Sequence, residues 1–102
     1  MKLEVEVCEA ISRREAGEDK LVISGHIIKD NGNEAFFYLE IGRITCKLCL
    51  EKGNIDLLES FEKILGKPLH MGEEAGFHMA IWRSSSDLIR RLEGLLGFEI
   101  II

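Results

Sequence analysis

The sequence predicts an α+β fold, and two kinds of periodicity together with one turn signal support that prediction. Apolar residues alternate with polar ones in the first half of the chain, which is typical of strands, and recur every three to four residues in two segments of the second half, which is typical of helices. Asn31-Gly32 separates two apolar runs and is the strongest short hairpin signal. The predicted order is βββαβαβ: an N-terminal three-stranded antiparallel β-meander followed by βαβ-type units, with two helices on one face of a two-layer domain.

Three strands are expected before residue 52. In "KLEVEV" (2–7) the apolar residues share one face, "AGEDK" follows as a turn, and "LVISGHIIK" (21–29) is apolar on both faces, which indicates a central strand. The third segment, "EAFFYLEIGRITCKLCL" (34–50), is long, and its apolar parity changes after Gly42. One extra residue there restores a single apolar face, so we predict a β-bulge at Gly42.

Two amphipathic helices and a last strand are expected after residue 53. "NIDLLESFEKILGKP" has one apolar face, with Asn54 suited to the N-cap and Gly66 to the C′ position. "SSSDLIRRLEGLLG" repeats this pattern, with Ser84 as predicted N-cap, Asp87 at N3 and Gly97 at the end. "FEIII" (98–102) is predicted to be a terminal strand.

The two helical segments align at an offset of 31 residues, with "DLLESFEKILG" matching "DLIRRLEGLLG". The match suggests an internal repeat, although two amphipathic helices that each end at glycine would look alike without one. A chain of 102 residues is long enough for one hydrophobic core. We therefore predict a single domain over 1–102, composed of a meander half (1–52) and an αβαβ half (53–102).

Composition narrows the functional classes. The net charge is −5, and no basic run is present, so a nucleic-acid partner is not expected. No apolar run approaches the roughly 20 residues that span a bilayer, and the N-terminus lacks the apolar stretch of a signal peptide, so we expect no membrane partner and a cytoplasmic location. The chain has fourteen glutamates and no glutamine, and a composition rich in glutamate and poor in glutamine is typical of thermophile proteins.

The "CKLC" motif raises the possibility of metal or thiol chemistry. In a strand, residues i and i+3 point to opposite faces, so Cys46 and Cys49 would diverge and be buried structural thiols. If a metal were bound, Cys46 and Cys49 would be its ligands together with His70 and His78, and Cys8 and His26 are further candidates to complete the site. No second CxxC is present, so we expect no metal and no other cofactor.

The predicted helix starts are a second candidate site. Lys52 precedes the first helix and Arg83 the second, and helix N-termini favour anions. A small anionic ligand held there would contact Lys52, Asn54, Arg83, Ser84, Ser85 and Ser86. Simple helix capping by the same residues is the structural alternative.

The favoured function is a non-enzymatic interaction module. Val22 and Ile28, and likewise Phe36 and Tyr38, make two strands apolar on both faces, so two helices on one face would leave apolar surface on the other. A symmetric homodimer, or another protein partner, would cover it. The anionic-ligand domain and a metal- or thiol-dependent protein or enzyme remain the alternatives, and no nucleotide or hydrolase motif is present to favour an enzyme.

Overall fold

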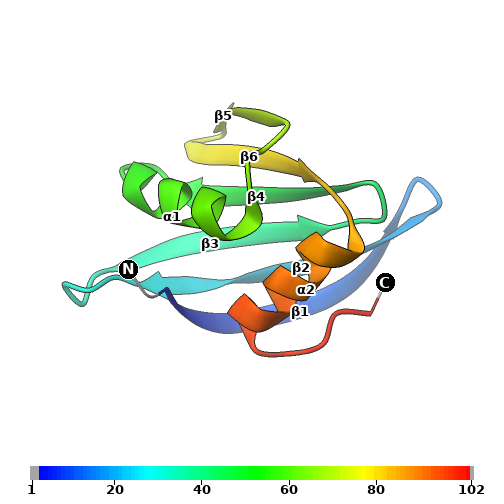
Figure 1. The fold of residues 1–102 in the computed structure, drawn as a ribbon, viewed down its shortest axis with the longest axis horizontal. Coiled ribbons are helices and arrows are strands. Elements are labelled where there is room, and N and C mark those ends of the chain that lie inside the picture. The colour runs from blue at the N-terminus through cyan, green and yellow to red at the C-terminus, as the bar shows by residue number, and fades with distance from the viewer. Residues whose placement is uncertain (1–2, 102) are drawn as a thin grey trace.

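A computed structural model describes residues 3–101 as a six-stranded antiparallel sheet with two helices (Figure 1). The α+β class is therefore confirmed. The strand order in the sheet is β1-β2-β3-β4-β6-β5, and every neighbouring pair is antiparallel. Along the chain the elements are β1 (Glu4–Glu15), β2 (Glu18–Ile28), β3 (Glu34–Ile41), β4 (Thr45–Glu51), α1 (Ile55–Leu65), β5 (His70–Glu74), β6 (Phe77–Arg83) and α2 (Ser86–Leu96).

The observed order, ββββαββα, differs from the predicted βββαβαβ at Gly42. The chain does not form a bulge there but reverses direction, and the Gly42 N–H donates to the Thr45 carbonyl oxygen at 3.0 Å. The predicted long strand is thus a hairpin of β3 and β4. A short turn and a bulge both change the apolar parity of a sequence, so the parity change at Gly42 fitted either structure.

The second half also differs from the predicted βαβ units. "HMGEE" forms the short edge strand β5, and Ala75-Gly76 then turns the chain into β6 with positive φ angles of 46° and 86°. No residue from 98 to 101 is in a strand, so the predicted terminal strand is not formed in the part of "FEIII" that the structure describes. Instead the Ile100 N–H donates to Glu93 Oε2 at 2.8 Å, which holds the tail against α2.

The predicted hairpin at Asn31-Gly32 is confirmed. Gly32 has φ of 85°, its N–H donates to the Lys29 carbonyl, and Asn31 Oδ1 accepts the Asn33 N–H at 2.9 Å. Asparagine and glycine meet the needs of this turn because the amide oxygen caps a backbone N–H and glycine adopts positive φ at low cost.

The helix boundaries lie close to the predicted ones, with one correction. Asn54 is the N-cap position of α1, and Gly66 and Gly97 end the two helices with positive φ. The N-cap of α2 is Ser85 rather than Ser84, and its Oγ accepts the Leu88 N–H at 3.1 Å. Asp87 is therefore at N2, and the predicted N3 position is taken by Leu88.

Both helices lie on the viewer's side of the sheet in Figure 1. Their buried residues Leu57, Phe61, Leu88 and Leu92 form one core with the strands. The sheet residues of this covered face are Ile23, Ile27, Ala35, Phe37, Leu39, Ile41, Cys46, Leu48, Leu50, Ala80 and Trp82. Trp82 Nε1 donates to the Gly66 carbonyl at 2.8 Å and so ties β6 to the end of α1.

The register of β1 on β2 shifts between Val7 and Glu9, so Cys8 is an extra residue in a bulge. Gly25 lies beside it, and a Cβ added to Gly25 would collide with the carbonyl oxygen of Glu6. The close approach of the two strands therefore requires glycine at this position.

Candidate interaction surface

The side of the sheet away from the helices carries the alternate residues of the central strands. We call it the open face, and the register assigns to it Val22, Ser24, His26, Phe36, Tyr38, Glu40, Lys47, Cys49, Phe77, Met79 and Ile81. Cys49 is buried, and the remaining side chains are partly exposed. This is the second apolar side that the sequence of the strands indicated.

The middle of the open face is apolar and aromatic. Phe36 packs edge-on against His26, with ring centroids 5.9 Å apart, and tilts against Phe77 at 6.1 Å. A hollow of about 320 Å³ is lined by these phenylalanines, Tyr38 and Cys49, and the Lys47–Glu74 ion pair (2.8 Å) also borders it. The face is therefore a shallow apolar surface with a charged margin.

Charge is divided between the two ends of this face. At the end where β3 begins, the register places Glu4, Glu6, Glu34, Glu51 and Glu74 on the open face. At the opposite end, it places three cations, Arg13, Lys20 and Arg83, together with three carboxylates, Glu15, Glu18 and Glu40. The surface thus has an acidic end, an apolar middle and an end of mixed charge that carries the cations.

The residues predicted at the start of α1 make contacts within the chain. Lys52 Nζ lies 3.1 Å from Glu73 Oε2 in β5. Asn54 does not cap the helix with its side chain, and its Nδ2 instead donates to the Glu51 carbonyl at 2.8 Å. The Lys52 charge is therefore paired with a carboxylate, and the anionic-ligand alternative gains no support from this turn.

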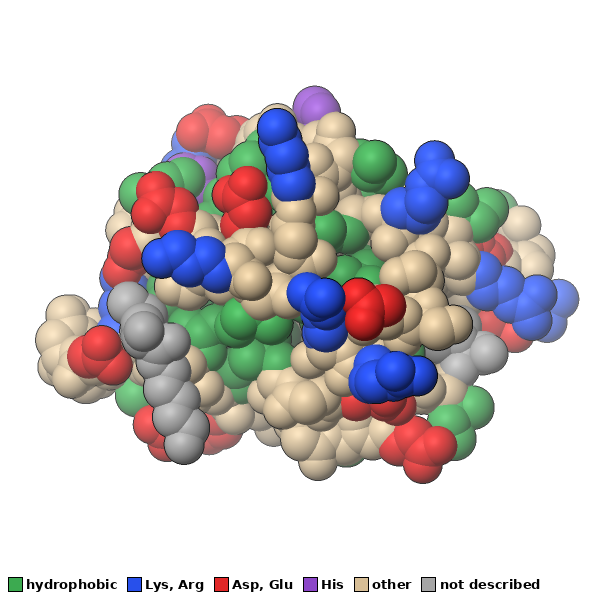
Figure 2. All heavy atoms as spheres, in the orientation of Figure 1, with side chains coloured by type: hydrophobic (Ala, Val, Ile, Leu, Met, Phe, Trp, Pro, Cys, Tyr) green, Lys and Arg blue, Asp and Glu red, His purple; other side chains and the backbone are tan. Residues whose placement is uncertain are grey.

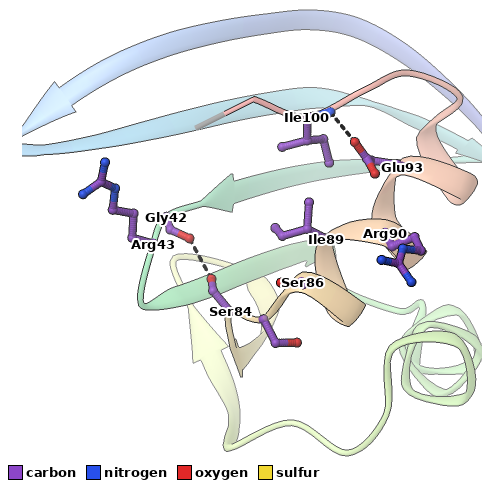
Figure 3. A pocket seen from close by; sticks show the side chains of 9 residues that line it. Gly42, Arg43, Ser84, Ser86, Ile89, Arg90, Glu93 and Ile100 are labelled. Carbon is purple, nitrogen blue, oxygen red and sulfur yellow. Dashed lines mark hydrogen bonds between the residues drawn. The ribbon is translucent and has the colours of Figure 1, made fainter.

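The serines before α2 line a shallow pocket of about 480 Å³ together with Arg43 and Arg90 (Figure 3). Ser84 Oγ donates to the Gly42 carbonyl at 2.7 Å and lies 3.2 Å from Cys46 Sγ, while Ser85 is the helix cap. In Figure 3 the Arg43 and Arg90 side chains lie at opposite ends of the pocket and do not converge.

Arg83, also predicted at this second site, lies outside the pocket. Its position in β6 points it to the open face, on the other side of the sheet from α2. Among the three predicted serines, Ser86 has no side-chain hydrogen bond to any residue from 3 to 101, whereas Ser84 and Ser85 each have one. The binding of an anion at this turn stays a prediction.

The two cysteines of "CKLC" lie on opposite faces of β4. Cys46 pairs across the sheet with Ile41 and Trp82 and is 1% exposed, whereas Cys49 pairs with Tyr38 and Met79 and is 8% exposed. Burial raises the pKa of both thiols above the ordinary value of 9.0, which disfavours the reactive thiolate.

The two histidines predicted as metal ligands, His70 and His78, do not lie beside these cysteines. His70 lies on the side of the open face, and His78 lies on the other side of the β5–β6 hairpin. Within residues 3–101, no three metal-ligating side chains come together.

The structure brings together two of the further candidate ligands, Cys8 and His26, whose contact with each other the sequence does not indicate. Cys8 Sγ lies 3.6 Å from His26 Nδ1 on the open face, and Cys8 is exposed. The residues are 18 positions apart, and their contact depends on the bulge at Cys8 and on the register of β1 on β2. The one local signal is Gly25, a glycine within a strand, which is a mark of bulges.

The helix side of the molecule has a different character. Figure 2 shows basic and acidic side chains interspersed over it, with hydrophobic side chains visible between them. Neither helix in the described part of the chain is long and apolar enough to cross a membrane.

In comparisons with known proteins, no family model, no curated protein and no solved structure matches this chain.

Proposed function

We propose that this chain is a non-enzymatic protein-interaction domain whose partner is a second copy of itself, bound through the open face. The observation that carries the proposal is the combination of an apolar middle with an acidic end and, at the other end, the cations Arg13, Lys20 and Arg83. Apolar surface of this kind on one layer of a two-layer domain is a common interaction site.

The division of charge favours one geometry of pairing. Two sheets pack face to face with their strands nearly aligned. If the two-fold axis lies in the interface and crosses the strands, the acidic end of each copy meets the end of the other copy that carries the cations. Arg13 and Lys20 then approach Glu4 and Glu6 of the second copy, and Arg83 approaches Glu51 and Glu74.

Some charged groups of the face already have partners within the chain, and others do not. Arg13, Lys20 and Lys47 form ion pairs with Glu15, Glu40 and Glu74. We find no ion pair of Arg83, Glu4 or Glu6 within residues 3–101. Complementary charges at a rim steer association and fix the register of two partners.

Sedimentation velocity of Met79→Lys tests the proposal. Met79 lies in the middle row of the open face, between Cys49 and Gly72, so a charge there is expected to weaken dimerisation at least tenfold. Leu69→Lys is the matched control, because Leu69 is apolar, 62% exposed and outside the open face, so its variant should dimerise like the wild type. A wild-type chain that stays monomeric at high micromolar concentration contradicts the proposal.

The orientation is tested by charge reversal. Arg13→Glu and Glu4→Arg should each weaken the dimer, and the double variant should recover most of the affinity, because each charge then meets its opposite on the other copy. If the double variant is weaker than both single variants, the two ends do not meet and the axis runs along the strands instead.

A further inference from the structure

We infer that Cys8 and His26 form half of a tetrahedral zinc site, which two copies of the chain complete across the open-face dimer. This inference rests on the proposed dimer and names what the same surface binds. The ligand set is two cysteine sulfurs and two histidine nitrogens, which is a typical zinc environment in proteins.

The first argument is the geometry of the pair. In a tetrahedral zinc site with Zn–S of about 2.3 Å and Zn–N of about 2.0–2.1 Å, the sulfur and nitrogen of neighbouring ligands lie about 3.6 Å apart. Cys8 Sγ and His26 Nδ1 lie 3.6 Å apart. The two atoms are therefore already spaced as two ligands of one metal ion.

The second argument is how firmly the pair is held. Cys8 is the extra residue of the bulge, and a bulge re-aims the side chain that it carries. Gly25 permits the close strand approach beside it. Phe36 packs against the His26 ring at an interplanar angle of 73°. Ligands whose orientation is fixed before binding lose little freedom when a metal arrives.

The third argument is that the proposed two-fold axis passes close to the pair. Tyr38, Cys49 and Met79 form the middle row of the open face, and Ser24 continues this row into β2 beside Glu9. Cys8 and His26 lie immediately next to that row. With an axis along the row, the same pair of the second copy lies just across the axis, equally close to it on the other side.

The separation of two packed sheets also suits the metal. Such sheets lie about 10 Å apart. A zinc ion bound by a cysteine at about 2.3 Å lies within roughly 5 Å of that cysteine's own strand, so one ion midway between the sheets can be reached from both.

One copy alone offers only two ligands, since no third metal-ligating side chain joins Cys8 and His26 in the part of the chain that the structure describes. On binding, each Cys8 thiol loses its proton to solvent and each neutral His26 donates the lone pair of Nδ1, so one zinc releases two protons per dimer.

The test is zinc titration of the untagged, metal-free protein, read by sedimentation velocity and by zinc content after desalting. We expect one zinc per two chains, a dimer at least tenfold tighter with zinc than with chelator, and the visible absorption of tetrahedral thiolate-bound cobalt when Co²⁺ replaces zinc. Cys8→Ser and His26→Asn should each remove these effects. His78→Asn is the matched control, because His78 faces away from the open face, and it should change none of them.

The outcomes separate this inference from the proposed function. A dimer that Met79→Lys disrupts but that binds no zinc overturns the zinc site and leaves the dimer standing. One zinc per chain on a monomer overturns the shared site. A chain that is monomeric with and without zinc overturns both.

Discussion

The covered and open faces of this sheet are built from the same strands and bury their side chains to different depths. In β4, Leu48 and Leu50 on the covered face are fully buried under α1 and α2, while Lys47, the residue before Leu48, is partly exposed on the open face. In β3 and β4 the covered face is apolar from end to end, whereas the open face is apolar in the middle and charged at the ends. One face thus has the composition of a folding core, and the other has the composition of a protein interface.

The largest expected effect is the loss of stability caused by a substitution in the covered face that leaves the open face unchanged. Leu48→Ala removes a fully buried side chain and should lower the free energy of unfolding by about 2–5 kcal/mol. Cys49→Ala, the adjacent residue on the open face, removes a smaller group and should cost about 1 kcal/mol or less. Urea denaturation at low protein concentration measures both, and equal losses would mean that the two faces are equivalent cores.

A second effect tests the close approach of β1 and β2. Gly25→Ala places a Cβ against the Glu6 carbonyl oxygen and should cost about 2–3 kcal/mol of stability, with the zinc response lost as the bulge shifts. Gly94→Ala is the matched control. Gly94 is in α2 with open space around it, so alanine should stabilise the helix by up to about 1 kcal/mol. If Gly25→Ala is as stable as the wild type, the bulge tolerates a side chain and the close approach of β1 and β2 does not require glycine.

The smallest expected effect is a loss of stability at alkaline pH. Burial raises the pKa of Cys46 and, on the open face, of Cys49 above their ordinary 9.0. A thiol with a raised folded-state pKa stabilises the fold below its unfolded pKa, and this contribution is lost as the pH rises through the folded one. The urea midpoint should therefore decline from about pH 9 upward, and less so in Cys46→Ala relative to that variant's own neutral value. A midpoint that rises over this range contradicts the burial of the thiols.

The sequence predicts local features of this fold better than its register. Asn31-Gly32 and the two amphipathic helices carry their own signals, in turn chemistry and in helical period. At Gly42 the sequence does not distinguish a bulge from a hairpin turn, because both leave the same change of apolar parity. The strand β5 has no sequence signal, because all but one of its residues are exposed and it has no apolar alternation.

The candidate sites follow the same division. The apolar character of the open face is visible in Phe36 and Tyr38, because strand alternation is a local property. The charged ends and the Cys8–His26 contact depend on which residues pair across strands. That information lies in the three-dimensional register, which "CKLC" and the serines before α2 do not reveal.

Each face carries a natural probe, because the chain has one tyrosine and one tryptophan. Tyr38 lies in the middle row of the open face and Trp82 in the core of the covered face. The most direct measurement is an NMR dilution series that follows the Tyr38 ring and the Trp82 indole N–H, which is hydrogen-bonded to Gly66. The Tyr38 resonances should shift with concentration while the Trp82 resonance stays fixed. A Tyr38 signal that is constant from low micromolar to millimolar concentration would contradict association through the open face.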